Sequence, residues 1–165
     1  MKQRSRALRA VLAVVLVHAG WARAEATSSA AMRGLTSKTT VTRADCQRAA
    51  AALVAGLGAP TRQSEVVALL EKRHVMRRGD ARDSGGVATR GYACLLFVRA
   101  LGERGGVMRH LLPDSEHYAY RHLDFLNMIP AGGSGRPITG LELVSLLGLS
   151  RKRMTGRDAA LEAAR

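Results

Sequence analysis

The sequence predicts a mainly α-helical protein, a small helical bundle of two to three helix–loop–helix repeats. Apolar residues recur at spacings of three and four, and no segment has the strict alternation of an amphipathic strand. A helix start led by threonine also recurs, at intervals of 47 and 50 residues. A period of this length is typical of units that bury their apolar faces against one another.

The N-terminal segment, residues 1–26, has the three parts of a secretory signal peptide. It opens with a cationic stub that contains Lys2, Arg4, Arg6 and Arg9. An apolar run over 10–19 follows, too short for a helix that spans a bilayer, and two Ala-x-Ala cleavage points end at 24 and 26. We expect an exported protein, periplasmic or extracellular, with no stable membrane span after cleavage. An uncleaved membrane anchor is the alternative.

The charge of the exported part is strongly positive. Removal of the first 26 of the 165 residues leaves 139, enough for one domain, and 21 basic against 12 acidic side chains give a net charge of +9. A basic surface attracts polyanions, and export argues against nucleic acid as the partner. An Arg-rich and Ala-rich composition can also arise from a GC-rich genome without selection for binding.

Three regions follow the signal segment. Residues 27–38 are rich in Ser, Thr and Ala without an apolar period and predict a flexible lead-in. Residues 39–149 contain the helical repeats, whose apolar stripes cover 46–57, 66–70, 93–101, 118–126 and 141–147. Residues 150–165 predict a basic C-terminal tail or a weak helix.

Start and stop signals frame the helices. A threonine stands before three of them: Thr42, Thr89 and Thr139. Three residues later come Asp45, Tyr92 and Glu142. An acid at this position completes or supports a capping box, which a tyrosine cannot do. Glycines in Leu-Gly pairs are expected to end the same helices in a left-handed conformation: Gly58, Gly102 and Gly148.

The repeat resembles the surface-layer homology (SLH) domain, in which a helix and a Gly-rich loop precede an Ile-Thr-Arg-Ala-Glu motif that opens a second helix. The best motif match is Ala-Thr-Arg-Gly-Tyr at 88–92, whose helix ends in Arg-Ala-Leu at 99–101, and the best loop match is 127–139. The resemblance covers 39–149. It departs from the family where Gly140 replaces the arginine and Tyr92 the acid, where the first unit lacks its leading helix, and where the aromatic residues of the family's ligand grooves are nearly absent.

The resemblance implies a pseudo-three-fold bundle of three units that holds a secreted protein to wall polymers or peptidoglycan. We therefore expect a non-catalytic module, bound to an anionic wall polymer or to an envelope protein. Arg43 and Arg90 follow the cap threonine, where a guanidinium beside free backbone N–H groups forms an anion site, and Arg136 is a weaker candidate. In the family the matching arginine helps to hold an acidic saccharide. The alternative is that these arginines pair with acids such as Asp45 or Asp83.

The two cysteines, Cys46 and Cys94, allow two states. In an oxidising compartment they can close a disulfide, which would stabilise the fold by a few kcal/mol. Two buried free thiols are the alternative, and the sequence does not decide between them.

Catalytic, metal and cofactor motifs are not predicted. There is no Gly-x-Ser-x-Gly elbow and no Cys-x-x-Cys pair. The histidines outside the signal segment lack the spacing of metal ligands: His74, His110, His117 and His122. Two other functions remain open: a scaffold that docks a protein partner, and a small envelope enzyme that uses His122 with Asp124.

Overall fold

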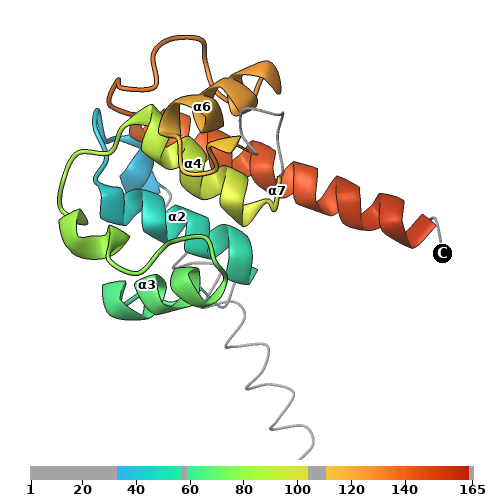
Figure 1. Ribbon diagram of the computed structural model, residues 1–165, viewed down its shortest axis with the longest axis horizontal. Coiled ribbons are helices and arrows are strands. Elements are labelled where there is room, and N and C mark those ends of the chain that lie inside the picture. The colour runs from blue at the N-terminus through green and yellow to red at the C-terminus, as the bar shows by residue number, and fades with distance from the viewer. Residues whose placement is uncertain (1–32, 57–58, 104–110, 164–165) are drawn as a thin grey trace, which may run out of the picture. The chain divides into compact units, whose positions relative to one another are not determined.

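The computed structural model describes residues 33–56, 59–103 and 111–163, and the chain divides into two compact bodies, 1–34 and 35–165. The predicted signal segment lies outside the described residues. The helices of the second body are α2 (Arg43–Ala55), α3 (Gln63–Lys72), α4 (Arg90–Ala100), α6 (Glu116–Phe125) and α7 (Gly140–Ala163), with a short 3-10 helix η2 (Asp80–Asp83) (Figure 1). The prediction of a mainly α-helical protein is confirmed. Across the described ranges no helix is long and apolar enough to cross a membrane.

Helix α4 is the centre of the core. It packs against α2, α6 and α7, while α2 also contacts α3 and α7 (Figure 1). Nine consecutive residues of α4, from Arg90 to Val98, are buried, which explains why its sequence is apolar on all sides. Its Phe97 is among the largest fully buried side chains. Each shorter helix, α3 and α6, covers one side of this central group.

The predicted threonine caps are present at the starts of α2, α4 and α7. The Thr42 side chain accepts from the backbone N–H of Asp45, and Thr89 accepts from that of Tyr92. Thr139 accepts from the backbone N–H of Glu142, whose carboxylate accepts in return from the backbone of Thr139. Thus α2 and α7 begin with complete capping boxes and α4 with half of one, as the residues at the third position dictate.

The predicted helix ends are right for α4 and wrong for α7. Gly102 follows α4 with a φ of 64°, and the N–H of Glu103 closes the turn on the carbonyl of Val98. Helix α2 ends at Ala55 and is capped by Gly56, with a φ of 62°, before the expected Gly58, which lies outside the described residues. Helix α7 continues through Gly148 to Ala163.

The C-terminal segment 150–163 is helical and forms the second half of α7, and its last turns extend beyond the neighbouring helices (Figure 1). Two arginines hold it against the end of α4. Arg153 Nε lies 2.7 Å from Glu103 Oε1, and Arg157 Nη1 donates to the carbonyl of Leu101 at 3.1 Å. Each of these contacts joins residues that are 50 or more positions apart in the sequence, so local sequence patterns do not predict them.

The end of the predicted lead-in is fixed in place. The carbonyl of Lys38 accepts from the first N–H of α7, at Gly140, and Lys38 Nζ donates to Asp45 in α2. A β-carbon on Gly140 would lie 1.7 Å from the carbonyl oxygen of Leu35. Residues 35–38 are thus part of the folded body and not a flexible segment.

Candidate functional site

The starts of α2, α4 and α7 meet in a closed ring of backbone hydrogen bonds. The ring joins the residues just before the three cap threonines. Val41 donates to Ile138 at 3.2 Å, Ile138 donates to Ala88 at 3.0 Å, and Ala88 donates to Val41 at 2.9 Å. All three residues are buried, with exposures of 0–1%. The repeated motif thus brings three distant parts of the chain to one place.

A second set of hydrogen bonds caps each of these helices with a loop from elsewhere. The N–H of Arg43 donates to Gly86, and the N–H of Arg90 donates to Arg136, at 2.9 and 2.8 Å. The N–H of Gly140 donates to Lys38 at 2.9 Å. The free N–H groups that made these helix starts candidate anion sites are therefore partly used by the protein itself.

Arg43 reaches the surface. Its Nη1 lies 3.2 Å from Asp83 Oδ2, and its guanidinium carbon lies 5.1 Å from the centre of the Tyr92 ring. The Arg43 side chain is 31% exposed and that of Asp83 is 66% exposed, so solvent screens the pair. The buried Nε of Arg43 has no partner among the described residues. The Tyr92 ring therefore orients the Arg43 guanidinium, while Asp83 leaves some of its hydrogen-bond donors free.

Arg90 is buried. Its Nη2 pairs with Glu142, and the two side chains are only 9% and 15% exposed. Burial by itself raises the pKa of Glu142, but the hydrogen bond from the Thr139 backbone and the contact with Arg90 bring that pKa below its usual value. Arg90 therefore neutralises a carboxylate that also caps α7. This arrangement agrees with the alternative expectation, in which the arginine pairs with an acid of the protein and stabilises the fold.

Arg136 lies in the loop that covers Arg90. A β-carbon on Gly132 would come within 2.4 Å of Arg90 Nη1 and 3.8 Å of Arg136 Nη1, so both guanidinium groups border this glycine. The Arg136 side chain is exposed and has no acidic partner among the described residues. Of the three predicted arginines, Arg90 and Arg136 are thus brought together at one loop, and Arg43 lies beside Tyr92 at another.

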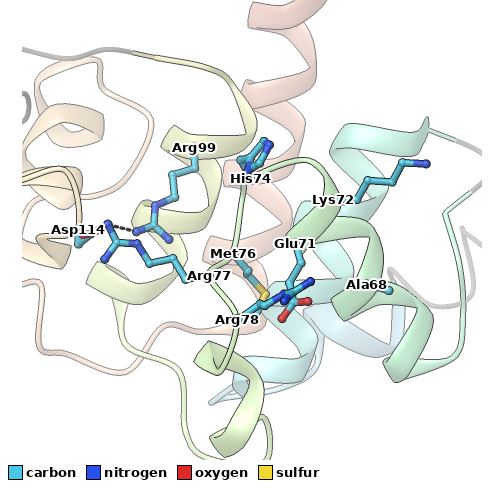
Figure 2. Close-up of a pocket in the computed structure, with 9 residues that line it drawn as sticks. All are labelled: Ala68, Glu71, Lys72, His74, Met76, Arg77, Arg78, Arg99 and Asp114. Atoms are coloured by element: carbon cyan, nitrogen blue, oxygen red, sulfur yellow. Dashed lines mark hydrogen bonds and ion pairs between the residues drawn. The ribbon is translucent and has the colours of Figure 1, made fainter.

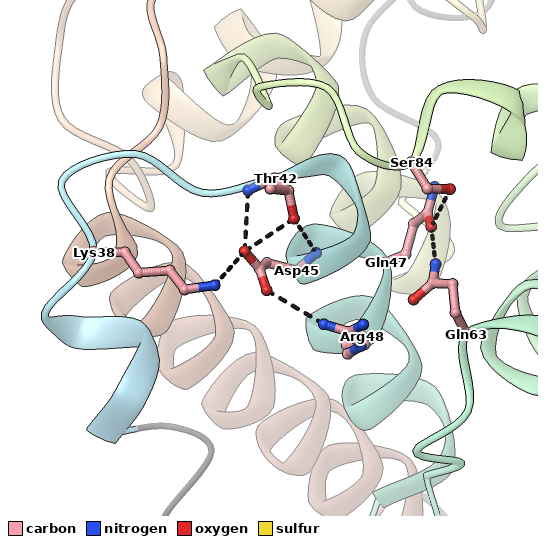
Figure 3. A network of polar contacts seen from close by, with 7 residues as sticks. All are labelled: Lys38, Thr42, Asp45, Gln47, Arg48, Gln63 and Ser84. Carbon is pink, nitrogen blue, oxygen red and sulfur yellow. Dashed lines mark hydrogen bonds and ion pairs between the residues drawn. The ribbon is translucent and has the colours of Figure 1, made fainter.

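The Asp45 carboxylate is a structural centre that the sequence only partly revealed (Figure 3). It accepts from Lys38 Nζ at 2.8 Å and from both the backbone and the hydroxyl of Thr42 at 3.0 Å, with Arg48 at 3.4 Å. Burial alone raises the pKa of Asp45, and these hydrogen bonds outweigh it and lower the pKa. Lys38 was missed as a partner because it lies in the segment expected to be flexible.

Tyr92 has partners that compensate for the missing acid. Its hydroxyl accepts from Gln47 Nε2 at 2.8 Å, and the Gln47 carbonyl oxygen in turn accepts from Ser84 and Gln63 (Figure 3). The carboxylate that the motif lacks at Tyr92 comes instead from Glu116, whose Oε2 accepts from the Thr89 hydroxyl at 3.0 Å. No local sequence signal identifies Glu116, because it lies 27 residues away.

Cys46 and Cys94 are free, buried thiols in this structure, the second of the two predicted states. They belong to the adjacent helices α2 and α4. Burial raises the pKa of the Cys94 thiol to about 12 and raises that of Cys46 as well. Both thiols therefore stay protonated at neutral pH and are poor nucleophiles.

His122 Nε2 is buried and forms no hydrogen bond, to Asp124 or to any other described residue. His122 Nε2 instead lies 3.8 Å from Glu103 Oε2, in a group that includes Arg153. Within the described ranges no three His, Cys, Asp or Glu side chains are placed to hold a metal ion. His110 lies outside those ranges.

The arrangement can hold anions by charge and hydrogen bonding, most directly at Arg43, whose acid partner is exposed and displaceable. Comparison of the chain with protein-family models, with curated proteins and with solved structures finds no match.

Proposed function

We propose that this chain is an exported, non-catalytic module that attaches to the cell envelope by binding an anionic wall polymer or peptidoglycan. In this proposal three SLH-like units surround a pseudo-three-fold axis at the starts of α2, α4 and α7. The observation that carries it is the closed ring of hydrogen bonds through Val41, Ala88 and Ile138. In this ring each unit donates to one neighbour and accepts from the other, as a cyclic arrangement of like units requires.

The interlocking loops give further support. The loop before α4 caps α2, the loop before α7 caps α4, and the segment before α2 caps α7. Each contact between neighbouring units therefore combines one helix start with one loop from the next unit. Such a contact places side chains from two units at a shared surface, which is where a repeat protein builds its binding sites.

Arg43 is the principal ligand residue of the proposal. An oxyanion of the polymer replaces Asp83, whose side chain is 66% exposed and is held only by a screened ion pair. The Tyr92 ring keeps the guanidinium oriented while the acid is exchanged. Arg136 adds a second, exposed cation, and Arg90 keeps its structural pairing with Glu142. The net charge of +9 after residue 26 draws the polymer toward the protein.

The test is co-sedimentation of the purified exported chain with insoluble peptidoglycan, with and without its attached anionic polysaccharide. We expect binding that weakens as the salt concentration rises, because exposed charges carry it. The variant Arg43→Gln with Arg136→Gln should lose at least about tenfold in affinity, since both charge-assisted contacts are removed. The matched control is Arg121→Gln with Arg151→Gln, which removes the same charge from exposed positions on α6 and α7.

Two results contradict the proposal. One is the absence of binding to either wall preparation. The other is an equal loss of affinity in the test and control pairs, which would mean attraction to overall charge without a site. The two wall preparations also separate a polysaccharide ligand from peptidoglycan itself.

Export is tested separately by cell fractionation of a C-terminally tagged chain. We expect the tagged protein outside the cytoplasm, with a mass reduced by the loss of residues 1–26. Retention in the cytoplasm at full length would contradict export.

A further inference from the structure

A basic hollow of about 680 Å³ lies beside the C-terminal ends of α3 and α4 (Figure 2). This volume is in the range of small-molecule sites. Its basic side chains are Lys72, His74, Arg77, Arg78 and Arg99. Two carboxylates, Glu71 and Asp114, also line it. Without counting the histidine, four permanent cations therefore face two acids.

Two of the arginines are held side by side. Asp114 bridges them, with one oxygen paired to Arg77 Nη2 and the other to Arg99 Nη2 (Figure 2). Arg99 Nη1 also donates to the carbonyl of Val75 at 3.2 Å, and its side chain is only 13% exposed. Asp80 lies 3.8 Å from Arg99 and adds a weaker contact. Each guanidinium has five N–H donors, so these contacts orient Arg77 and Arg99 without using all their donors.

Lys72 and Arg78 contribute charge that the protein does not neutralise. Both side chains are exposed, and neither has an acid within ion-pair distance among the described residues. The Arg77 and Arg99 guanidinium groups are thus held in place before a ligand arrives, which reduces the ordering cost of binding, and the exposed Lys72 and Arg78 add positive charge to the lining of the same hollow.

The chain turns sharply to form this hollow. His74 adopts a φ of 57°, and the N–H groups of Val75 and Met76 return to the carbonyl of Leu70 at 2.8 and 3.2 Å. Val75 and Met76 are buried, with exposures of 1% and 3%, and anchor the segment. Arg77 follows directly, so its backbone is fixed at the edge of the hollow.

The same turn after α6 carries no such charge. Asn127 adopts a φ of 54°, and the N–H of Met128 returns to Leu123 at 2.9 Å, as Val75 does to Leu70. Met128 and Ile129 are buried in the same way. The residues that correspond to Lys72, Arg77 and Arg78 are Phe125, Pro130 and Ala131. The turn therefore forms without basic residues, and the packing of the repeat does not account for the cations of the hollow.

We infer that this hollow binds a small multivalent oxyanion, a ligand with two or more phosphate or carboxylate groups, at a site separate from Arg43. The inference stands without the proposed attachment to the wall. The ligand contacts Lys72 and Arg78 together with the free donors of Arg77 and Arg99. Asp114 stays in place and keeps the two guanidinium groups adjacent.

The test is isothermal titration of the full chain with pyrophosphate and, in a second arm, with citrate, at low ionic strength. We expect saturable one-to-one binding, tighter than that of inorganic phosphate or acetate, and a shift of the His74 ring proton signals. The variant Lys72→Gln with Arg78→Gln should weaken binding by about tenfold or more. The control Arg121→Gln with Arg151→Gln should leave it unchanged. The arm with the tighter binding identifies the class of anion.

Three outcomes overturn the inference. They are the absence of saturable binding, an equal loss in the test and control pairs, and a loss of binding in Arg43→Gln. The last outcome would place the anion at the helix starts and not in the hollow. Wall binding can fail in the co-sedimentation test while pyrophosphate binding is retained, and the reverse also holds, so the two proposals fail independently.

Discussion

Arg43 and Arg90 occupy the same position, the first residue after a cap threonine, yet the protein uses them differently. Arg90 pairs with a carboxylate of α7, and both side chains are largely buried. Arg43 pairs with Asp83 of the short helix η2, and the Asp83 side chain is mostly exposed to solvent. The comparison shows that the motif fixes the place of the guanidinium, while the partner supplied by another part of the chain decides its role. We propose that Arg90 stabilises the fold and that Arg43 binds the ligand.

The third helix start explains why the arginine is absent there. Gly140 stands at this position because the carbonyl of Leu35 lies 1.7 Å from where a β-carbon would be. Similarly, a β-carbon on Gly91 would come within 2.8 Å of the Glu116 side chain, which supplies the carboxylate to Thr89. Close packing by other segments therefore leaves no room for a side chain at Gly140 or at Gly91, the residue after Arg90.

The largest change in stability is expected for Gly140→Ala, which extends the comparison of Arg43 and Arg90 to the start of α7. The methyl group collides with backbone that cannot rotate away, and we expect unfolding free energy to fall by about 3 kcal/mol. Gly148→Ala, in the same helix with open space around it, is the control and should be neutral or stabilising by up to about 1 kcal/mol. Urea denaturation measures both. Equal stability of the two variants would contradict the close contact with Leu35.

The next effect is expected for Arg90→Gln. It leaves the largely buried Glu142 without its cation, and we expect a loss of about 2 kcal/mol in urea denaturation, reduced from the fully buried case by partial exposure. The double variant Arg90→Gln with Glu142→Gln should recover part of this loss, since no charge is left unpaired and glutamine still caps α7. Additive losses would mean that the ion pair does not couple the two residues.

A smaller effect is expected from pH. The pKa values of Asp45 and Glu142 are lowered in the folded protein, so their contribution is complete above the unfolded values, near pH 4, and is lost as the pH falls through the folded values. At the start of α4 the corresponding residue is Tyr92, whose pKa is raised by burial, so this side chain stays protonated over the acidic range. Thermal unfolding between pH 6 and pH 2 should show a decline below about pH 4. Asp45→Asn should flatten part of it, and an unchanged profile would contradict the role of Asp45.

The sequence predicts local features of this fold well, because they depend on neighbouring residues. The caps at Thr42, Thr89 and Thr139 and the left-handed Gly102 follow from spacings of a few residues. The continuation of α7 past Gly148 was missed, because contacts of that segment with the end of α4 hold it.

The candidate sites were less predictable, since their partners come from distant segments. Arg43 and Arg90 were found from the motif, but nothing local distinguishes an exposed acid such as Asp83 from a buried one such as Glu142. The basic run over 72–78 is visible in the sequence. Its assembly into a hollow requires the left-handed turn at His74 and the bridge by Asp114, neither of which has a local signal.

The division of roles between the two arginines is tested most directly by two readouts on Arg43→Gln. We expect a change in unfolding free energy within about 0.5 kcal/mol, because the ion pair with Asp83 is screened by solvent, together with a clear loss of co-sedimentation with the wall polymer. A variant that unfolds much more easily but still binds the wall polymer as the parent chain does would contradict the account.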